Sequence, residues 1–192
     1  MPLTSVEPSQ ASFKAALGSV AASVNVITMW DSGPRDEHRR PLGMTATAFA
    51  SVSADPLLVL VCINRATRTY DHVAASGRFG VNILGSAARE ISDYCGRPGG
   101  DKVLEPGWLS DPETWRSPAL SGALAFLDCR VDQEVPAGTH AVIIGAVEGI
   151  GLPALAQHFE PLLHFRGRYR QLDAVRQAAV PRPLPIALEE LA

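Results

Sequence analysis

The sequence predicts a mainly β protein, an antiparallel barrel with a few inserted helices. About seven segments have the length and residue pattern of strands, and short helical segments fall between them. Strands and helices do not alternate regularly, so a doubly wound parallel sheet is disfavoured. No G-x-G-x-x-G motif links a predicted strand to a helix, and this excludes a Rossmann-type dinucleotide site.

Composition describes an ordinary globular protein. The chain has 192 residues, of which 46% are hydrophobic and 19% charged, and we expect a single domain over 1–192, with a core at about 13–172 and a tail at 173–192. A net charge of −3 argues against nucleic acid as a partner. No apolar run reaches the roughly 20 residues of a membrane span, and the first residues do not resemble a signal peptide. Three scattered cysteines indicate reduced thiols, so we expect a cytoplasmic protein.

Residue periodicity assigns the individual elements. Apolar residues at helical spacing predict helices over 10–20, 69–76 and 86–95, the second with Thr69 as N-cap and Gly77 after its end. Alternating or continuous apolar runs predict strands over 23–30, 43–53, 57–64, 79–84, 123–135, 139–150 and 162–172. The stretch 97–118 lacks periodicity and is long for a plain loop, which is typical of a lid, an interface or a binding loop. A helical turn is expected over 155–159.

The stretch Gly43–Ser53 stands out because of its small and hydroxyl-bearing residues. As one strand it would place Thr45, Thr47 and Ser51 on the same face, with small apolar residues on the other. Such a face can donate hydrogen bonds to an anionic or carbonyl-rich ligand. An edge strand with solvated hydroxyls explains the same pattern, and the stretch alone does not decide between the two.

Few residues are suited to acid, base or nucleophile roles. The sequence has no G-x-S-x-G or H-E-x-x-H motif, and its five histidines lack metal-ligand spacing, so no metal site is expected. His140, after a glycine-containing turn at the mouth of a strand, is the histidine most suited to a ligand site. Flavin chemistry needs little from a protein beyond binding, orientation and electrostatics, because the cofactor carries the reaction. The same residues would equally suit a binding module.

Several motifs, in order, resemble the flavin reductase family with the FMN-binding split-barrel fold. These are NAD(P)H:flavin oxidoreductases, the reductase components of two-component monooxygenases. The resemblance covers Phe13–Leu172, nearly the whole chain. It rests on GMTATAFASVS, LLVLVCIN, SGRFGVNIL, ALAFLDCRV, GTHAVIIGAVEGI and LLHFRGRYRQL.

The resemblance implies roles for individual residues. Those implied to contact the cofactors are Thr45, Ala46, Thr47, Ala48, Ser51, Cys62, Ile63, Asn64, Arg68, Thr69, Phe79, Asn82, Arg166, Gly167, Arg168 and Tyr169. The turn 66–69 would hold the flavin phosphate, with Arg65 or Arg68. His140 would position the nicotinamide, and Arg166 or Arg168 would face the phosphates of the nicotinamide nucleotide.

The resemblance also implies an activity and partners. The protein would take a hydride from NADH or NADPH onto FMN or FAD, and reduced flavin would diffuse to a separate monooxygenase. The family fold implies a homodimer. Two alternatives remain open: a non-catalytic flavin- or haem-binding split-barrel protein, and a flavoprotein oxidoreductase with permanently bound FMN.

The chain departs from the family pattern at three positions: Leu57 where a second proline is frequent, Thr139 where an aspartate often precedes the histidine, and Val103 where an aromatic residue is common. The last two bear on the nicotinamide side and on how the loop covers the flavin.

Overall fold

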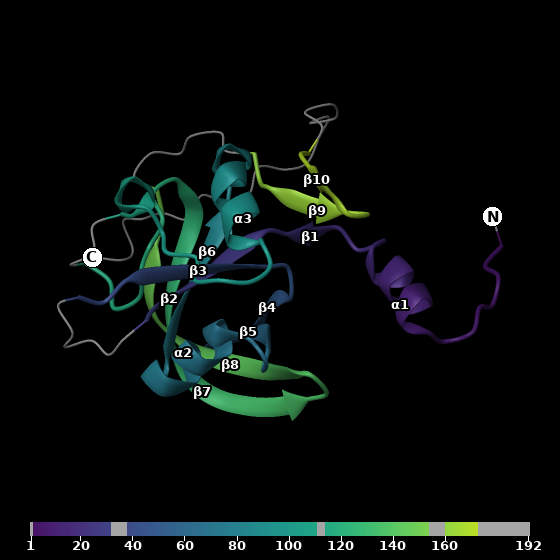
Figure 1. Ribbon diagram of the computed structural model, residues 1–192, viewed down its shortest axis with the longest axis horizontal. Helices are drawn as coiled ribbons and strands as arrows, with labels where there is room; N and C mark the ends of the chain where they lie inside the picture. Colours follow the sequence, from purple (N-terminus) through teal and green to yellow (C-terminus); the bar gives the residue numbers. More distant parts are fainter. Residues whose placement is uncertain (1, 32–37, 111–113, 154–159, 173–192) are drawn as a thin grey trace.

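The computed structural model describes residues 2–31, 38–110, 114–153 and 160–172. Within these ranges the chain forms two antiparallel sheets with short helices beside them (Figure 1). The expected helical turn at 155–159 and the tail 173–192 lie outside the described residues. The main sheet has seven strands in the order β3-β2-β6-β7-β8-β5-β4, and a small sheet has the order β1-β9-β10. The mainly β fold is therefore confirmed.

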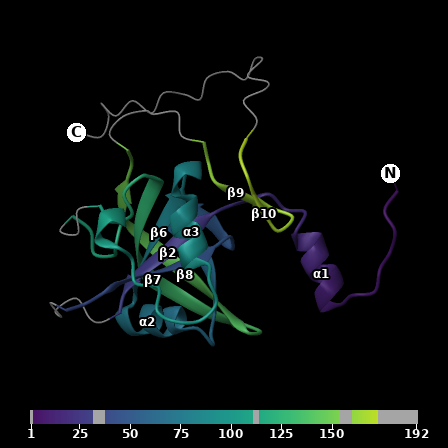
Figure 2. The same cartoon turned by 45° about the horizontal axis from the view of Figure 1, so that its top comes forward.

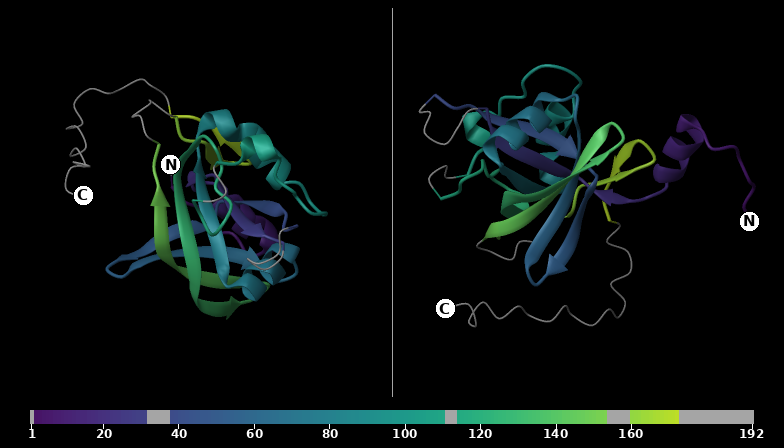
Figure 3. Two further views of the ribbon diagram at one scale, coloured as in Figure 1. Left: turned by 90° about the vertical axis from the view of Figure 1, so that its left-hand side faces the viewer. Right: turned by 90° about the horizontal axis from the view of Figure 1, so that it is seen from below.

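The main sheet contains β2 (Asn25–Trp30), β3 (Pro41–Ala46), β4 (Phe49–Ala54), β5 (Leu57–Asn64), β6 (Arg78–Leu84), β7 (Ala123–Ala137) and β8 (His140–Gly151). The small sheet contains β1 (Ala22–Ser23), β9 (Leu163–Phe165) and β10 (Arg168–Arg170). The helices are α1 (Gln10–Leu17), α2 (Arg68–Ser76) and α3 (Arg89–Cys95), with 3-10 turns at Ser86–Ala88 and Pro106–Trp108. Figure 3 shows β7 and β8 as the long hairpin along the barrel wall.

The prediction of one strand over Gly43–Ser53 is wrong. Strand β3 ends at Ala46, the chain turns at Thr47 and Ala48, and β4 begins at Phe49. These consecutive strands occupy opposite edges of the seven-stranded sheet. Two hydrogen bonds attach this corner to neighbouring strands: the Asn25 side-chain amide donates to the Ala46 carbonyl at 3.4 Å, and the Cys62 N–H donates to the Ala48 carbonyl at 3.0 Å. The corner therefore carries the chain from one edge of the sheet to the opposite edge.

The final predicted strand, 162–172, is in fact a hairpin. Strands β9 and β10 pair antiparallel, with the turn at Arg166 and Gly167, whose φ angles are 50° and 74°. Both angles lie in the left-handed region, which a continuous strand does not contain. The Arg166 N–H also donates to the Gly18 carbonyl at 2.8 Å, so the hairpin is attached to the end of α1.

Two predicted helix starts need correction. Helix α2 begins at Arg68 and is capped by Thr67, not Thr69, while Gly77 after its end has the left-handed φ of 65° that the sequence suggested. Ser86 opens a 3-10 turn and makes no side-chain cap, and α3 follows from Arg89. Helix α1 is present, with a Ser9–Ser12 capping box, but it buries none of its residues. It projects away from the barrel, as Figures 1 and 2 both show.

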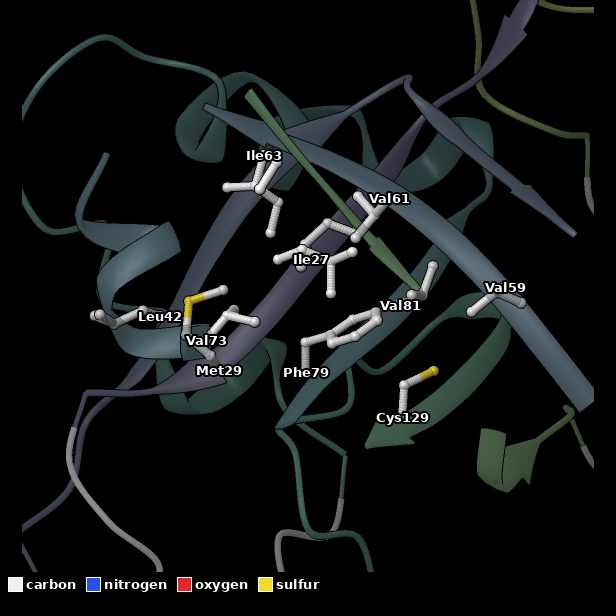
Figure 4. Close-up of a cluster of buried hydrophobic side chains, with 12 residues drawn as sticks. Ile27, Met29, Leu42, Val59, Val61, Ile63, Val73, Phe79, Val81 and Cys129 are labelled. Atoms are coloured by element: carbon white, nitrogen blue, oxygen red, sulfur yellow. The ribbon is translucent and has the colours of Figure 1, made fainter. Parts of the chain in front are cut away.

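The core has two parts that lie on either side of β2 and β3. One cluster fills the barrel beneath α2, where Phe79 lies near Val81, Ile27 and Cys129 (Figure 4). The second cluster packs α3 against the outside of the sheet through Ile91 and Cys95. Alternation along β3 serves both parts, because Met44 packs on the first cluster and a Cβ at Gly43 would meet the Sγ of Cys95 at 2.7 Å in the second.

Candidate functional site

A pocket of about 300 Å³ lies between β3, the start of α2 and the loop that follows α3. Its walls combine apolar side chains with backbone, hydroxyl groups and charges. The lining residues are Leu42, Gly43, Met44, Ala66, Thr67, Arg68, Thr69, Gly99, Gly100, Asp101 and Lys102. The predicted phosphate turn 66–69 is thus part of one wall.

Local hydrogen bonds build that wall from the end of β5. The Asn64 side-chain carbonyl accepts from the Ala66 N–H at 2.9 Å, and the Asn64 backbone carbonyl accepts from the Thr67 hydroxyl at 2.7 Å. Thr67 in turn caps α2 by accepting from the Tyr70 N–H at 3.4 Å. A helix start leaves its first N–H groups without intrahelical partners and carries a partial positive charge, so this wall favours an anion.

Charged side chains stand around the same wall. Arg68 and Lys102 line the pocket, and Arg68 Nη1 lies 2.7 Å from Asp101 Oδ1. Arg40 Nη2 lies 3.3 Å from Asp101 Oδ2, and Arg40 Nε lies 2.6 Å from Asp31 Oδ2. A guanidinium and an ammonium beside free N–H groups and threonine hydroxyls match the oxygens of a phosphate.

His140 lies next to this wall through strand pairing. The register of β5 and β8 places His140 opposite Asn64, and the Arg65 N–H donates to the Thr139 carbonyl at 3.0 Å. The imidazole is exposed, and its Nδ1 lies 2.9 Å from the Thr139 hydroxyl. In the family an aspartate often stands at position 139, where its carboxylate could orient the imidazole. In this chain the neutral Thr139 hydroxyl contacts that ring nitrogen instead.

The remaining predicted residues on β3, β4 and β5 have mixed orientations. Thr45 turns toward α3 and donates to the Ser92 carbonyl at 2.7 Å, while Ala46 packs on the core cluster inside the barrel. Thr47, Ala48 and Ser51 are exposed at the corner and on β4. Cys62 is half-buried, whereas the Ile63 side chain is fully buried. The expected common hydroxyl face does not form, because the corner at 47–48 interrupts the alternation.

Two residues that were predicted to contact the cofactor lie in the core of the described protomer. Phe79 is fully buried inside the barrel and packs against the backbone of Gly145. Asn82 is also fully buried, and its side chain donates to the Val26 carbonyl and the Thr28 hydroxyl at 3.1 Å each and accepts from the Leu120 N–H at 2.7 Å. With these polar groups occupied, Asn82 joins two strands to a loop, and neither side chain faces the pocket.

The C-terminal hairpin lies elsewhere in the protomer. Figure 1 shows β9 and β10 at the top of the molecule and the β7–β8 turn, next to His140, at the bottom. The Tyr169 hydroxyl lies 2.8 Å from the Ser92 hydroxyl, and Arg89 stacks over the Tyr169 ring at 5.2 Å. Burial raises the pKa of Tyr169. The described protomer does not bring Arg166, Gly167, Arg168 and Tyr169 together with His140.

Sequence reasoning expected a lid, an interface or a binding loop over 97–118, but it named no residue of the loop after α3 as a ligand contact. Gly99, Gly100 and Asp101 close the pocket on the side opposite α2. Both glycines have left-handed φ angles, 74° and 66°, so the Gly-Gly pair was the available signal for a tight, functional turn. The pocket also uses Gly43 and Met44 at the start of the conspicuous stretch.

Neither a metal centre nor a membrane-spanning helix occurs in the part of the chain that the structure describes. No group of three or more His, Cys, Asp or Glu side chains could hold a metal ion there. No helix in the same ranges is long and apolar enough to cross a membrane. Burial raises the pKa of both Cys95 and Cys129 to about 12, so neither thiol is a ready nucleophile or ligand.

The fold and pocket define a split-barrel protein with a site suited to a phosphate-bearing cofactor. The flavin reductase like domain model matches residues 17–173, and the chain belongs to this family. It is 36% identical over 155 residues to the reductase component of flavin-dependent trigonelline monooxygenase from Acinetobacter baylyi, covering 80% of this chain but 46% of that protein. It is 34% identical over 179 residues to the FMN reductase (NADH) RutF of Pseudomonas syringae pv. syringae, covering 93% and 94% of the two chains.

Solved structures agree with this assignment. The flavin reductase PheA2 in its native state aligns with a TM-score of 0.71 and 33% identity, over 86% of this chain and 99% of that one. The Streptomyces globisporus NADH:FAD oxidoreductase SgcE6, in complex with NAD and FAD fragments, aligns with a TM-score of 0.77 and 25% identity, over 90% and 99%. The family prediction made from the motifs is confirmed.

Proposed function

We propose that this protein is an NAD(P)H-dependent flavin reductase that reduces FMN or FAD and supplies the reduced flavin to a partner monooxygenase. The observation that carries this proposal is the pocket where the start of α2, two threonines and two basic side chains converge, in a chain of the flavin reductase family. The relatives support the same activity, since one is named as a monooxygenase reductase component and another as an NADH-dependent FMN reductase.

The residues of this chain would bind and orient the reactants. The free N–H groups at the start of α2, the hydroxyls of Thr67 and Thr69, and the charge of Arg68 would hold the flavin phosphate. The backbone corner at Thr47 and Ala48 and the end of β5 at Asn64 would border the rest of the flavin. The bound flavin supplies the hydride acceptor, so the protein needs no acid or base of its own at this step.

His140 is proposed to position the nicotinamide. It is exposed beside Asn64, and the Thr139 hydroxyl at 2.9 Å fixes its ring. The arginines of the β9–β10 hairpin and His140 lie at different ends of one protomer (Figure 1). The arginines would therefore contribute to nucleotide binding only from a second copy of the chain.

A homodimer is part of the proposal. Apolar side chains on α1 are exposed by 64% at Phe13 and 55% at Leu17, and those on the β4–β5 hairpin by 46% at Val52 and 48% at Leu57. A second copy covering these surfaces would remove them from water. Light scattering after size exclusion tests the dimer, and a monomer at working concentration would contradict it.

We place the protein in the cytoplasm, where NAD(P)H is available and three free cysteines remain reduced.

The activity is tested by following loss of NADH or NADPH absorbance with FMN, FAD or no added flavin. We expect oxidation that depends on added flavin, because the reduced product must dissociate to reach a partner. Flavin binding without oxidation of either nucleotide would indicate a non-catalytic binding protein. Full turnover without added flavin would indicate a permanently bound cofactor and contradict the diffusible product.

A further inference from the structure

The pocket that we propose for the flavin phosphate contains an acidic side chain, whose negative charge disfavours phosphate binding. Asp101 is the one acid among the described lining residues, which also include the bases Arg68 and Lys102. Its Oδ1 lies 2.7 Å from Arg68 Nη1 and its Oδ2 lies 3.3 Å from Arg40 Nη2. The Asp101 side chain is 18% exposed, whereas that of Arg68 is 64% exposed. The guanidinium nearest the phosphate donors is therefore already paired with a carboxylate.

The backbone around Asp101 is held in place. Gly99 and Gly100 turn the chain with left-handed φ angles, and the Lys102 carbonyl then accepts from the Gly43 N–H at 3.0 Å. One residue later, the Val103 carbonyl accepts from the Tyr94 hydroxyl at 2.9 Å. Asp101 is thus tied to β3 and α3 on its C-terminal side, so its carboxylate stays at the pocket wall.

A fixed carboxylate affects a phosphate ligand in two ways. It repels the negative charge of the phosphate, and it shares the Arg68 guanidinium that the phosphate would otherwise bind in full. Both effects weaken binding of a phosphate-bearing flavin and leave a flavin without phosphate unaffected. They also speed dissociation, since differences in affinity at one site are mostly differences in the off-rate.

We propose that Asp101 limits the affinity of this pocket for the flavin phosphate by holding Arg68, and so favours release of reduced flavin to the partner enzyme. This inference rests on the proposed function. It assigns the acid in the loop after α3 a role in setting affinity, and it explains why a site that must give up its product carries a negative charge beside its phosphate donors.

The test measures dissociation constants of FMN and riboflavin for the full chain, by quenching of flavin fluorescence without any nicotinamide nucleotide. For Asp101→Asn we expect roughly tenfold tighter FMN binding at low salt and no change for riboflavin, because one unit charge next to a phosphate is removed. The gain should shrink as salt rises. Asp101→Ser removes the same charge with a smaller side chain and should act in the same direction. Asp93→Asn is the matched control, an exposed acid paired with Arg89 on α3 and outside the pocket.

A second pair of variants tests the dependence on Arg68. Arg68→Met should weaken FMN binding. Adding Asp101→Asn to it should then tighten FMN binding by less than about threefold, since the shared partner is gone and only the direct repulsion of the phosphate is removed. Weaker FMN binding in the Asp101 variants, or equal changes for FMN and riboflavin, would overturn the inference. An undiminished gain in the Arg68→Met background would do the same. Failure of the unmodified chain to bind any flavin would instead contradict the proposed function itself.

Discussion

Replacement of Asn82 by alanine tests whether this residue belongs to the core or to the cofactor site. The amide joins β6 to the Val26 carbonyl, the Thr28 hydroxyl and the Leu120 N–H, at 3.1, 3.1 and 2.7 Å. Alanine would leave the buried Leu120 N–H without its acceptor and the β2 groups without their donor. Each buried polar group left unpaired costs about 1–3 kcal/mol. We therefore expect the free energy of unfolding to fall by about 2–5 kcal/mol.

The assay is urea unfolding followed by fluorescence, with Gln133→Ala as the control. Gln133 is exposed on β7, and its loss should change the free energy of unfolding by less than about 0.5 kcal/mol. Flavin affinity, measured at a temperature where the Asn82→Ala variant is folded, should be close to that of the unmodified chain. Unchanged stability together with a large loss of flavin affinity would refute the core assignment and restore the cofactor contact.

Four further predictions concern other sites. Gly145→Ala should destabilise the fold by about 1–3 kcal/mol in the same unfolding assay, because its Cβ would lie 2.5 Å from Phe79 Cζ; equal or greater stability would show that the ring has room to move. Burial raises the pKa of Cys95 and Cys129 to about 12. In the native protein both thiols should therefore resist a thiol reagent at pH 8 and react only on unfolding. These thiols ionise near pH 9 when the unfolded chain exposes them, but they stay protonated in the folded protein at that pH. The free energy of unfolding should therefore fall as pH rises from 9 toward 12, and a flat profile over this range would contradict the burial. His140→Ala should raise KM for the nicotinamide nucleotide by roughly tenfold while leaving the dissociation constant of FMN unchanged; an equal loss in both would place His140 at the flavin instead.

Much of the fold could be read from residue patterns because local periodicity encodes it directly. The continuous apolar run at β5 and the alternating run at β7 both form strands at close to their predicted bounds. The hairpin between β7 and β8 was marked by Gly138, whose φ is 61°. The family resemblance implied that the turn 66–69 belongs to a ligand site, and the structure places this turn at one wall of the pocket.

The errors arose where the fold overrides local pattern. Gly43–Ser53 alternates like one strand, yet its two halves form opposite sheet edges, and no periodicity marks a corner that only sheet closure requires. Phe79 and Asn82 lie within a motif that resembles the family, but in the structure they are enclosed by neighbours from distant segments, Gly145 and Leu120. A side chain's direction at such positions depends on which strand arrives beside it.

The sequence by itself determined the mainly β class, the main helices and strands, and the resemblance that identified the family, because these depend on local residue pattern and motif order. Only the tertiary structure decided which residues share the pocket. It joined the start of α2 to the loop 99–102 and His140 to Asn64, and it separated the β9–β10 hairpin from both. The physical reason is that strand pairing and packing between segments far apart in the chain bring these residues together. Such contacts leave no local pattern in the sequence.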